Sequence, residues 1–162
     1  KTSRLLLPAL LALGLLTAAP LAASETNLVS KAGAWSIFEH KKDCMTENTM
    51  ADGTIVRIGL SDKGSKGYLA TYNTGWIEFS KHKKYPLSYD LDGTTFDVEA
   101  HGDKREDIPG AKIKFEDPAV LVELAKKKVM TMSVDGVEMA KIDLTGSDEA
   151  IKQMLDCQAA QK

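Results

Sequence analysis

Residues 85–100 read YPLSYDLDGTTFDVEA, with apolar and polar side chains alternating on both sides of the pair Asp92-Gly93. An Asp-Gly pair in this setting is typical of a two-residue type I′ turn, which joins two antiparallel strands. The turn predicts three facing pairs, which are Leu91 with Thr94, Tyr89 with Phe96, and Leu87 with Val98. The polar residues expected on the other face are Ser88, Asp90, Asp97 and Glu99. The stretch therefore predicts a β-hairpin with one buried face.

A second hairpin is predicted in KVMTMSVDGVEMAKIDL, residues 128–144, around Asp135-Gly136. That turn places Val134 opposite Val137 and Met132 opposite Met139. Further alternation occurs upstream in AWSIFEH (34–40), TIVRIGL (54–60) and YLATYN (68–73). These stretches predict a meander of antiparallel strands.

Two helices are expected. Asp117 is a good N-cap, Pro118 suits the first helical position, and lysines follow the apolar residues, so we predict a short helix over about 117–127. In DLTGSDEAIKQMLDC (143–157), Ser147 is a candidate N-cap and acidic residues follow it, which predicts a C-terminal helix over about 147–159. The predicted class is α+β, with a mainly antiparallel β-sheet or sandwich and helices covering an edge or face.

The N-terminal residues 1–24 are typical of a signal peptide. Lys1 and Arg4 precede a twelve-residue apolar run, and small residues follow it, which predicts cleavage before Glu25. The apolar run is shorter than the ~20 residues that span a membrane, so we expect no membrane span in the mature form. Residues 25–162 are expected to form a single β-rich domain, with 25–34 as a flexible arm. The predicted location is periplasmic or secreted.

The two cysteines, Cys44 and Cys157, fit that location. In an oxidising compartment they are expected to form one disulfide. The alternative is that Cys44 is a nucleophile assisted by His40 and activated by neighbouring lysines. Removing the signal peptide changes the formal net charge from −2 to −4. Because neutralising phosphates needs a concentrated basic face, we expect no nucleic acid as partner.

Basic clusters beside an aromatic residue suggest where a partner could bind. The two basic clusters are residues 40–42 and residues 81–84. In a sheet they could lie together and bind an anionic envelope surface or an envelope protein. The alternative is ordinary solvated charge at strand ends, and for Trp76 it is core packing. The residues of this candidate binding surface are His40, Lys41, Lys42, Trp76, Lys81, His82, Lys83 and Lys84.

No spacing typical of a catalytic, cofactor or metal site occurs. His40, His82 and His101 lack the close spacing of common zinc motifs, so we predict no metal and no cofactor. A glycosidase-like carboxylate pair around Asp90 and Asp97 is conceivable, but solvent-facing strand positions explain these residues. We therefore predict no catalytic residues.

Three stretches occur in a characteristic order: AWSIFEHKKDC (34–44), the YPLSYDLDG hairpin (85–93) and the closing IDLTGSDEAIKQML (142–155). Together they resemble the invasion-associated locus B family of secreted alphaproteobacterial proteins. The resemblance implies a periplasmic or surface-associated β-rich protein and carries over no catalytic residues.

Three hypotheses for function follow. The first is a non-enzymatic periplasmic or secreted binding module, and the second is a small periplasmic inhibitor or immunity-type protein. The third is a hydrolase using Cys44 or converged carboxylates, which would need a deep pocket with titratable side chains.

Overall fold

A computed structural model describes residues 26–76 and 79–161 of the chain. These residues form ten strands and two helices. In chain order the elements are β1 (Thr26–Ala32), β2 (Trp35–His40), β3 (Asp43–Thr49), β4 (Ile55–Ser61), β5 (Lys66–Tyr72), β6 (Lys84–Leu91), β7 (Thr94–Arg105), β8 (Ile108–Phe115), α1 (Val120–Leu124), β9 (Val129–Val134), β10 (Val137–Asp143) and α2 (Ser147–Ala159).

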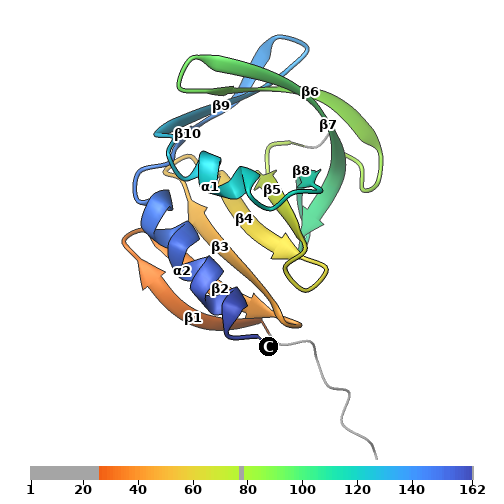
Figure 1. Ribbon diagram of the computed structural model, residues 1–162. Helices are drawn as coiled ribbons and strands as arrows, with labels where there is room; N and C mark the ends of the chain where they lie inside the picture. Colours follow the sequence, from red (N-terminus) through yellow and green to blue (C-terminus); the bar gives the residue numbers. More distant parts are fainter. Residues whose placement is uncertain (1–25, 77–78, 162) are drawn as a thin grey trace, which may run out of the picture.

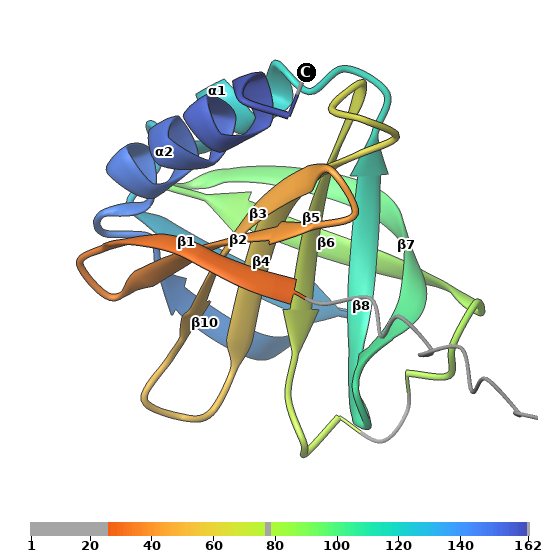
Figure 2. The same ribbon diagram turned by 90° about the horizontal axis from the view of Figure 1, so that it is seen from below.

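The strands form one antiparallel sheet in the order β1-β2-β3-β4-β5-β8-β7-β6-β9-β10. Consecutive strands pair with each other except at two places, β5/β6 and β8/β9. There β5 pairs with β8, and β6 pairs with β9. The sheet curls around a core, with β1–β3 facing the part built from β6, β9 and β10 (Figure 1). Both helices lie together on one side of the sheet (Figure 2). The predicted α+β class, a mainly antiparallel sheet with two helices, is confirmed.

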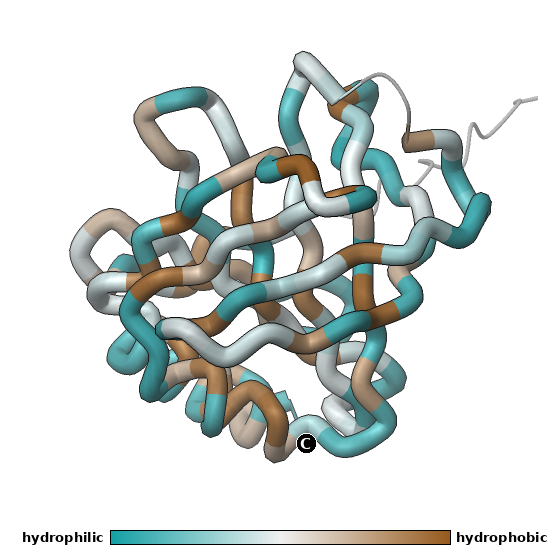
Figure 3. The backbone as a smooth tube through the Cα atoms, turned by 90° about the horizontal axis from the view of Figure 1, so that it is seen from above, coloured by the Kyte–Doolittle hydropathy of each residue, from teal (hydrophilic) through white to brown (hydrophobic). Residues whose placement is uncertain are grey.

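The core lies inside the curl and is built from the inward face of each strand. Apolar and polar residues alternate along several strands (Figure 3), as the two-residue period of a strand requires. Trp35 and Ile37 of β2 are fully buried, and Ile151 and Met154 of α2 pack into the same core. The indole Nε1 of Trp35 donates a hydrogen bond to the carbonyl of Thr145 at 3.0 Å, which ties β2 to the segment entering α2.

The first predicted hairpin has the expected register, since Leu91, Tyr89 and Leu87 pair with Thr94, Phe96 and Val98. Phe96, however, is 47% exposed, because it lies near the hairpin tip where the hairpin passes the edge of the core. The second hairpin pairs Val134 with Val137 as predicted, but a β-bulge between Glu138 and Ala140 shifts the register. Met132 therefore pairs with Ala140 instead of Met139.

The two helices differ from expectation mainly at their ends. α1 has only five residues, because the chain leaves the helix after Leu124 and turns toward β9. Asp117, the predicted N-cap, lies before the helix and accepts a hydrogen bond from the N–H of Ala119. α2 has the predicted bounds, but Ser147 is not its N-cap. Gly146, with φ of +80°, occupies that position, so Ser147 is already helical and its hydroxyl points into the core without a hydrogen-bond partner among the described residues.

The predicted flexible arm over 25–34 is wrong for most of its length. Thr26–Ala32 form β1, which pairs with β2 along the edge of the sheet. The Ser30 hydroxyl also donates to the Gln153 side chain of α2 at 2.7 Å, so this strand is held from two sides. The predicted signal peptide, residues 1–24, lies outside the described residues. Among the residues described, no helix is long and apolar enough to cross a membrane.

Candidate functional site

Cys44 of β3 and Cys157 of α2 form the predicted disulfide, with their Cα atoms 6.1 Å apart and a sequence separation of 113. The sulfur of Cys44 is therefore not a free nucleophile. Gln158 supports the same junction, because its side chain accepts from the N–H of Cys44 and donates to the carbonyl of Lys42. The last helix is thus fixed to the β2–β3 turn by a covalent bond and two hydrogen bonds.

The two basic clusters of the predicted binding surface do not meet. His40–Lys42 form the turn between β2 and β3, beside the β4–β5 turn, where Asp43 accepts a hydrogen bond from Gly64. Lys81–Lys84 follow the loop that leaves the opposite end of β5 (Figure 2). The side chain of His40 contacts Thr26 at 3.1 Å, and Lys84 pairs with Glu99 at 2.6 Å. The clusters therefore lie at different ends of the sheet.

Trp76 belongs to the core. It is 6% exposed and packs edge-to-face on Phe79, which packs in turn on Tyr85. The nearby basic segment is pinned to β7 through backbone hydrogen bonds of His82 and Lys83 with Gly102. This is the core-packing interpretation of Trp76. The aromatic ring beside these lysines is instead that of the half-buried Tyr85, whose centroid lies 5.5 Å from the Lys83 ammonium.

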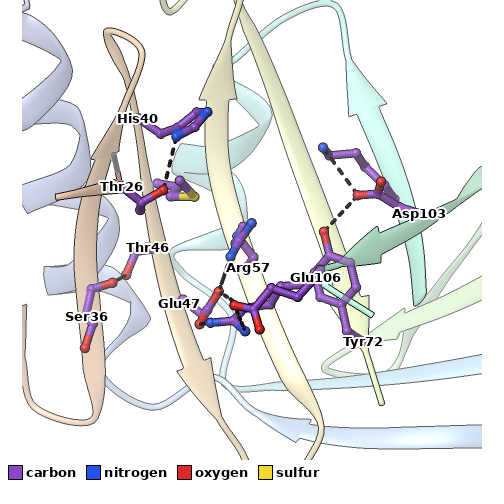
Figure 4. Close-up of polar contacts among 12 residues, drawn as sticks. Thr26, Ser36, His40, Thr46, Glu47, Arg57, Tyr72, Asp103 and Glu106 are labelled. Carbon is purple, nitrogen blue, oxygen red and sulfur yellow. Dashed lines mark hydrogen bonds and ion pairs between the residues drawn. The ribbon is translucent and has the colours of Figure 1, made fainter. Parts of the chain in front are cut away.

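The outer face of the sheet carries a polar network around Glu47. The Glu47 carboxylate accepts hydrogen bonds from both Arg57 and Arg105 over 2.6–3.0 Å (Figure 4). Beside it, the Tyr72 hydroxyl donates to Asp103, which also pairs with Lys112 at 3.5 Å. These contacts surround a small outer apolar cluster, formed by Met45, Ile55, Tyr68, Ala70 and Tyr72.

The electrostatics of this outer network suit a structural role. Burial lowers the pKa of Arg57, but the charge of Glu47 and the hydrogen bond to it raise that pKa above its ordinary value. Burial, and then the neighbouring Asp103 carboxylate, raise the pKa of Tyr72 well above its ordinary value. Burial likewise raises the pKa of Tyr68. Both tyrosines are therefore protonated near neutral pH, and the charged groups neutralise one another.

A cavity of about 390 Å³ opens between the β6–β7 hairpin, β8 and α1. Its wall is almost entirely apolar, with two charged residues among the twelve. The lining residues are Leu69, Tyr89, Leu91, Phe96, Val98, Ile113, Phe115, Val120, Glu123, Leu124, Lys127 and Met130. Pockets of this size and character commonly bind small apolar ligands. A larger hollow of about 540 Å³ lies beside α2, but lysine and glutamine side chains form part of its wall.

The wall of the cavity offers no charged group in its interior. Burial raises the pKa of Tyr89 to about 12, so its hydroxyl stays protonated, and it contacts the sulfur of Met132 at 3.3 Å. Phe96 and Val120 are 47% and 41% exposed and lie at the mouth, where Glu123 and Lys127 also line the opening. Chemically, the arrangement can exclude water around an apolar group and present charge only at the rim.

The mouth of the cavity is held in place by Asp92 at the tip of the β6–β7 hairpin. Its carboxylate accepts hydrogen bonds from the N–H groups of Val129 and Lys128 at 2.8 and 3.1 Å. The hairpin tip is thereby joined to the segment between α1 and β9. These contacts hold the two sides of the opening at a defined separation.

Over residues 26–76 and 79–161, no group of three or more His, Cys, Asp or Glu side chains is arranged to hold a metal ion. The carboxylates considered for hydrolysis are engaged locally, since Asp97 accepts from Ser88 at 2.6 Å and Asp90 accepts from the N–H of Gly93.

The fold and cavity define a class of structure. It is one curled antiparallel sheet with two helices on one side and a disulfide that links the last helix to the sheet. No protein-family model matches the sequence, and no curated protein is significantly similar to it. Among solved structures, the chain is similar to invasion associated protein B from Bartonella henselae, with a TM-score of 0.57 and 16% sequence identity. The match covers 82% of this chain and 99% of that chain. At this identity the match establishes a shared fold, in agreement with the resemblance noted in the sequence.

Two groups of residues were missed by sequence reasoning. The apolar face of the β6–β7 hairpin was predicted, but nothing in its pattern shows that part of this face borders a cavity. The Glu47 network had a weak signal, because Arg57 stands inside an apolar strand pattern and charged residues there usually have a partner. The second arginine bound to Glu47, Arg105, is 58 positions from Glu47 in sequence and was not predictable from local pattern.

Proposed function

We propose that this chain is a non-enzymatic, extracytoplasmic binding protein that holds an apolar group of its ligand in the cavity between the β6–β7 hairpin and α1. The observation that carries the proposal is the cavity itself, about 390 Å³ with an almost wholly apolar wall. A cavity of this kind excludes water from a bound apolar group, and burial of apolar surface supplies ~25 cal/mol per Å².

The proposed location has three supports. The N-terminal residues are typical of a signal peptide. The Cys44–Cys157 disulfide is of the kind that persists in oxidising compartments such as the periplasm. The fold is similar to that of an invasion associated protein.

The proposed site can be tested by a matched pair of substitutions on α1. Val120 and Val122 lie on the same short helix and are 41% and 45% exposed, but only Val120 lines the cavity. Tryptophan at position 120 would project its ring into the mouth, whereas tryptophan at position 122 adds the same area outside it. We expect the uncharged fluorescent probe N-phenyl-1-naphthylamine to bind the wild-type protein saturably, at one site.

We expect Val120→Trp to weaken binding of this probe by at least about tenfold, because the added ring fills space that the probe would occupy. Val122→Trp should bind like the wild type. Thermal melts of both variants show whether the fold is kept. Equal probe binding by the two variants, or no saturable binding by the wild type, would exclude the cavity as the binding site.

A further inference from the structure

We propose that the ligand of this cavity is a free single-chain amphiphile with an anionic head group, its hydrocarbon chain inside the cavity and its head beside Lys127. This inference rests on the proposed function, and it names the class of ligand.

The size of the cavity suits one hydrocarbon chain. A dry protein cavity of about 150 Å³ takes up one six-carbon benzene ring, so 390 Å³ has room for a chain of roughly ten to fifteen carbons. Leu69 and Met130 are buried and form part of the inner wall, whereas Phe96 and Val120 are partly exposed at the mouth. A chain entering past Phe96 would therefore meet only apolar side chains along its length.

The charges at the mouth select the head group. Among the cations of this segment, Lys126 is paired with Glu123 at 2.6 Å. The Asp92 carboxylate lies near Lys127 but accepts hydrogen bonds from the N–H groups of Lys128 and Val129. Lys127 lines the cavity, is only half-buried, and makes no ion pair within 4.0 Å in the part of the chain that the structure describes.

A cation at the rim of an apolar cavity complements an amphiphile whose charge is negative. A cationic head would be repelled by Lys127, and an uncharged head would offer this ammonium group no direct ionic partner when the chain excludes water around it. A carboxylate or phosphate head is attracted to Lys127 and gives it an ionic partner, because the ammonium can donate a charge-assisted hydrogen bond to it.

The test compares dodecanoate with 1-dodecanol, which share one chain length and differ in the head group. Both compounds, used below the concentrations at which they aggregate, are expected to displace N-phenyl-1-naphthylamine from the wild-type protein. Dodecanoate should bind about threefold to tenfold more tightly, as expected for one partly screened charge pair. This advantage should shrink as salt is added.

Lys127→Gln should remove the preference for dodecanoate by weakening dodecanoate binding, and it should not weaken the binding of 1-dodecanol, which forms no charge pair with Lys127. The control is Lys141→Gln on β10, which removes an exposed lysine that does not line the cavity. Lengthening the carboxylate from eight carbons should strengthen binding about threefold to fourfold per methylene, until the cavity is filled and the gain stops.

The outcomes separate this inference from the proposed function. Equal binding of dodecanoate and 1-dodecanol, with Lys127→Gln silent, would overturn the anionic head group while the cavity remains the binding site. Binding that depends on Lys127 but is untouched by Val120→Trp would place the ligand on the surface, and would overturn the proposed chain position. Failure of every probe to bind the wild type would overturn both.

Discussion

Glu47 shows how one residue can hold distant parts of this sheet together. Its side chain is 9% exposed, and it accepts hydrogen bonds from Arg57, on the adjacent strand β4, and Arg105, at the end of β7. A carboxylate removed from water to this extent requires compensating partners, and two guanidinium groups provide them. The arginines are 22% and 25% exposed, so their charges remain partly screened by solvent.

We expect Glu47→Gln to lower the free energy of unfolding by about 1–3 kcal/mol, because two partly buried arginines would lose their counter-charge. Glu99→Gln is the control, since Glu99 also pairs with a cation, Lys84, but both side chains are more than half exposed. That substitution should cost ~0–1 kcal/mol. Urea unfolding of the two variants measures the loss in the free energy of unfolding. Equal losses would mean that the burial of Glu47 adds nothing to the stability that its ion pairs provide.

The β6–β7 hairpin and the segment after α1 depend on each other through Asp92. Hydrogen bonds from the N–H groups of Val129, then Lys128, lower the pKa of Asp92 below its ordinary value, and nearby lysines add to the effect. Because the folded pKa is lowered, the carboxylate stabilises the folded protein above its unfolded pKa of ~3.9. This contribution is lost as the pH falls through the folded pKa.

We therefore expect Asp92→Asn to destabilise the protein near neutral pH and to reduce the fall in stability on acidification below about pH 4. The matched control is Asp135→Asn, because Asp135 takes the same left-handed backbone position in the β9–β10 turn. Melting temperatures measured from pH 7 to pH 2 compare the two variants. If both variants show the same pH profile as the wild type, the Asp92 contacts do not contribute in this way.

For the whole molecule, the main constraint is the disulfide between β3 and α2. Closing a loop of 113 residues removes roughly 4–5 kcal/mol of denatured-state entropy in the chain-entropy model, although measured values are often lower. In the folded protein the bond also keeps α2 against β1, β2 and β3, where Ile151 and Met154 complete the core.

We expect reduction of the Cys44–Cys157 disulfide to lower the melting temperature by many degrees, because a few kcal/mol is a large part of the stability of a small domain. The double variant Cys44→Ser, Cys157→Ser should melt at a similar temperature in the presence and absence of reductant. An unchanged wild-type melt after complete reduction, checked by thiol titration, would contradict this expectation.

Features that depend on short-range pattern were predictable from the sequence. The Asp-Gly pairs fix local backbone geometry, so the β6–β7 turn and its register followed from Tyr85–Ala100. The bounds of α2 followed from Ser147 and the acidic residues after it, although the N-cap is Gly146 and not Ser147. The disulfide followed from the cysteine count and the expected compartment, since only two cysteines are present.

Features that depend on contacts between distant segments required the folded chain. The strand Thr26–Ala32 carries little pattern of its own and forms because β2 offers an edge with unpaired backbone groups. Gly102 is needed because a side chain there would overlap the carbonyl of Ser80, a neighbour set by the path of the preceding loop. The apolar cavity likewise forms where the β6–β7 hairpin, β8 and α1 come together. These elements meet through the curvature of the sheet, which no single stretch of residues encodes.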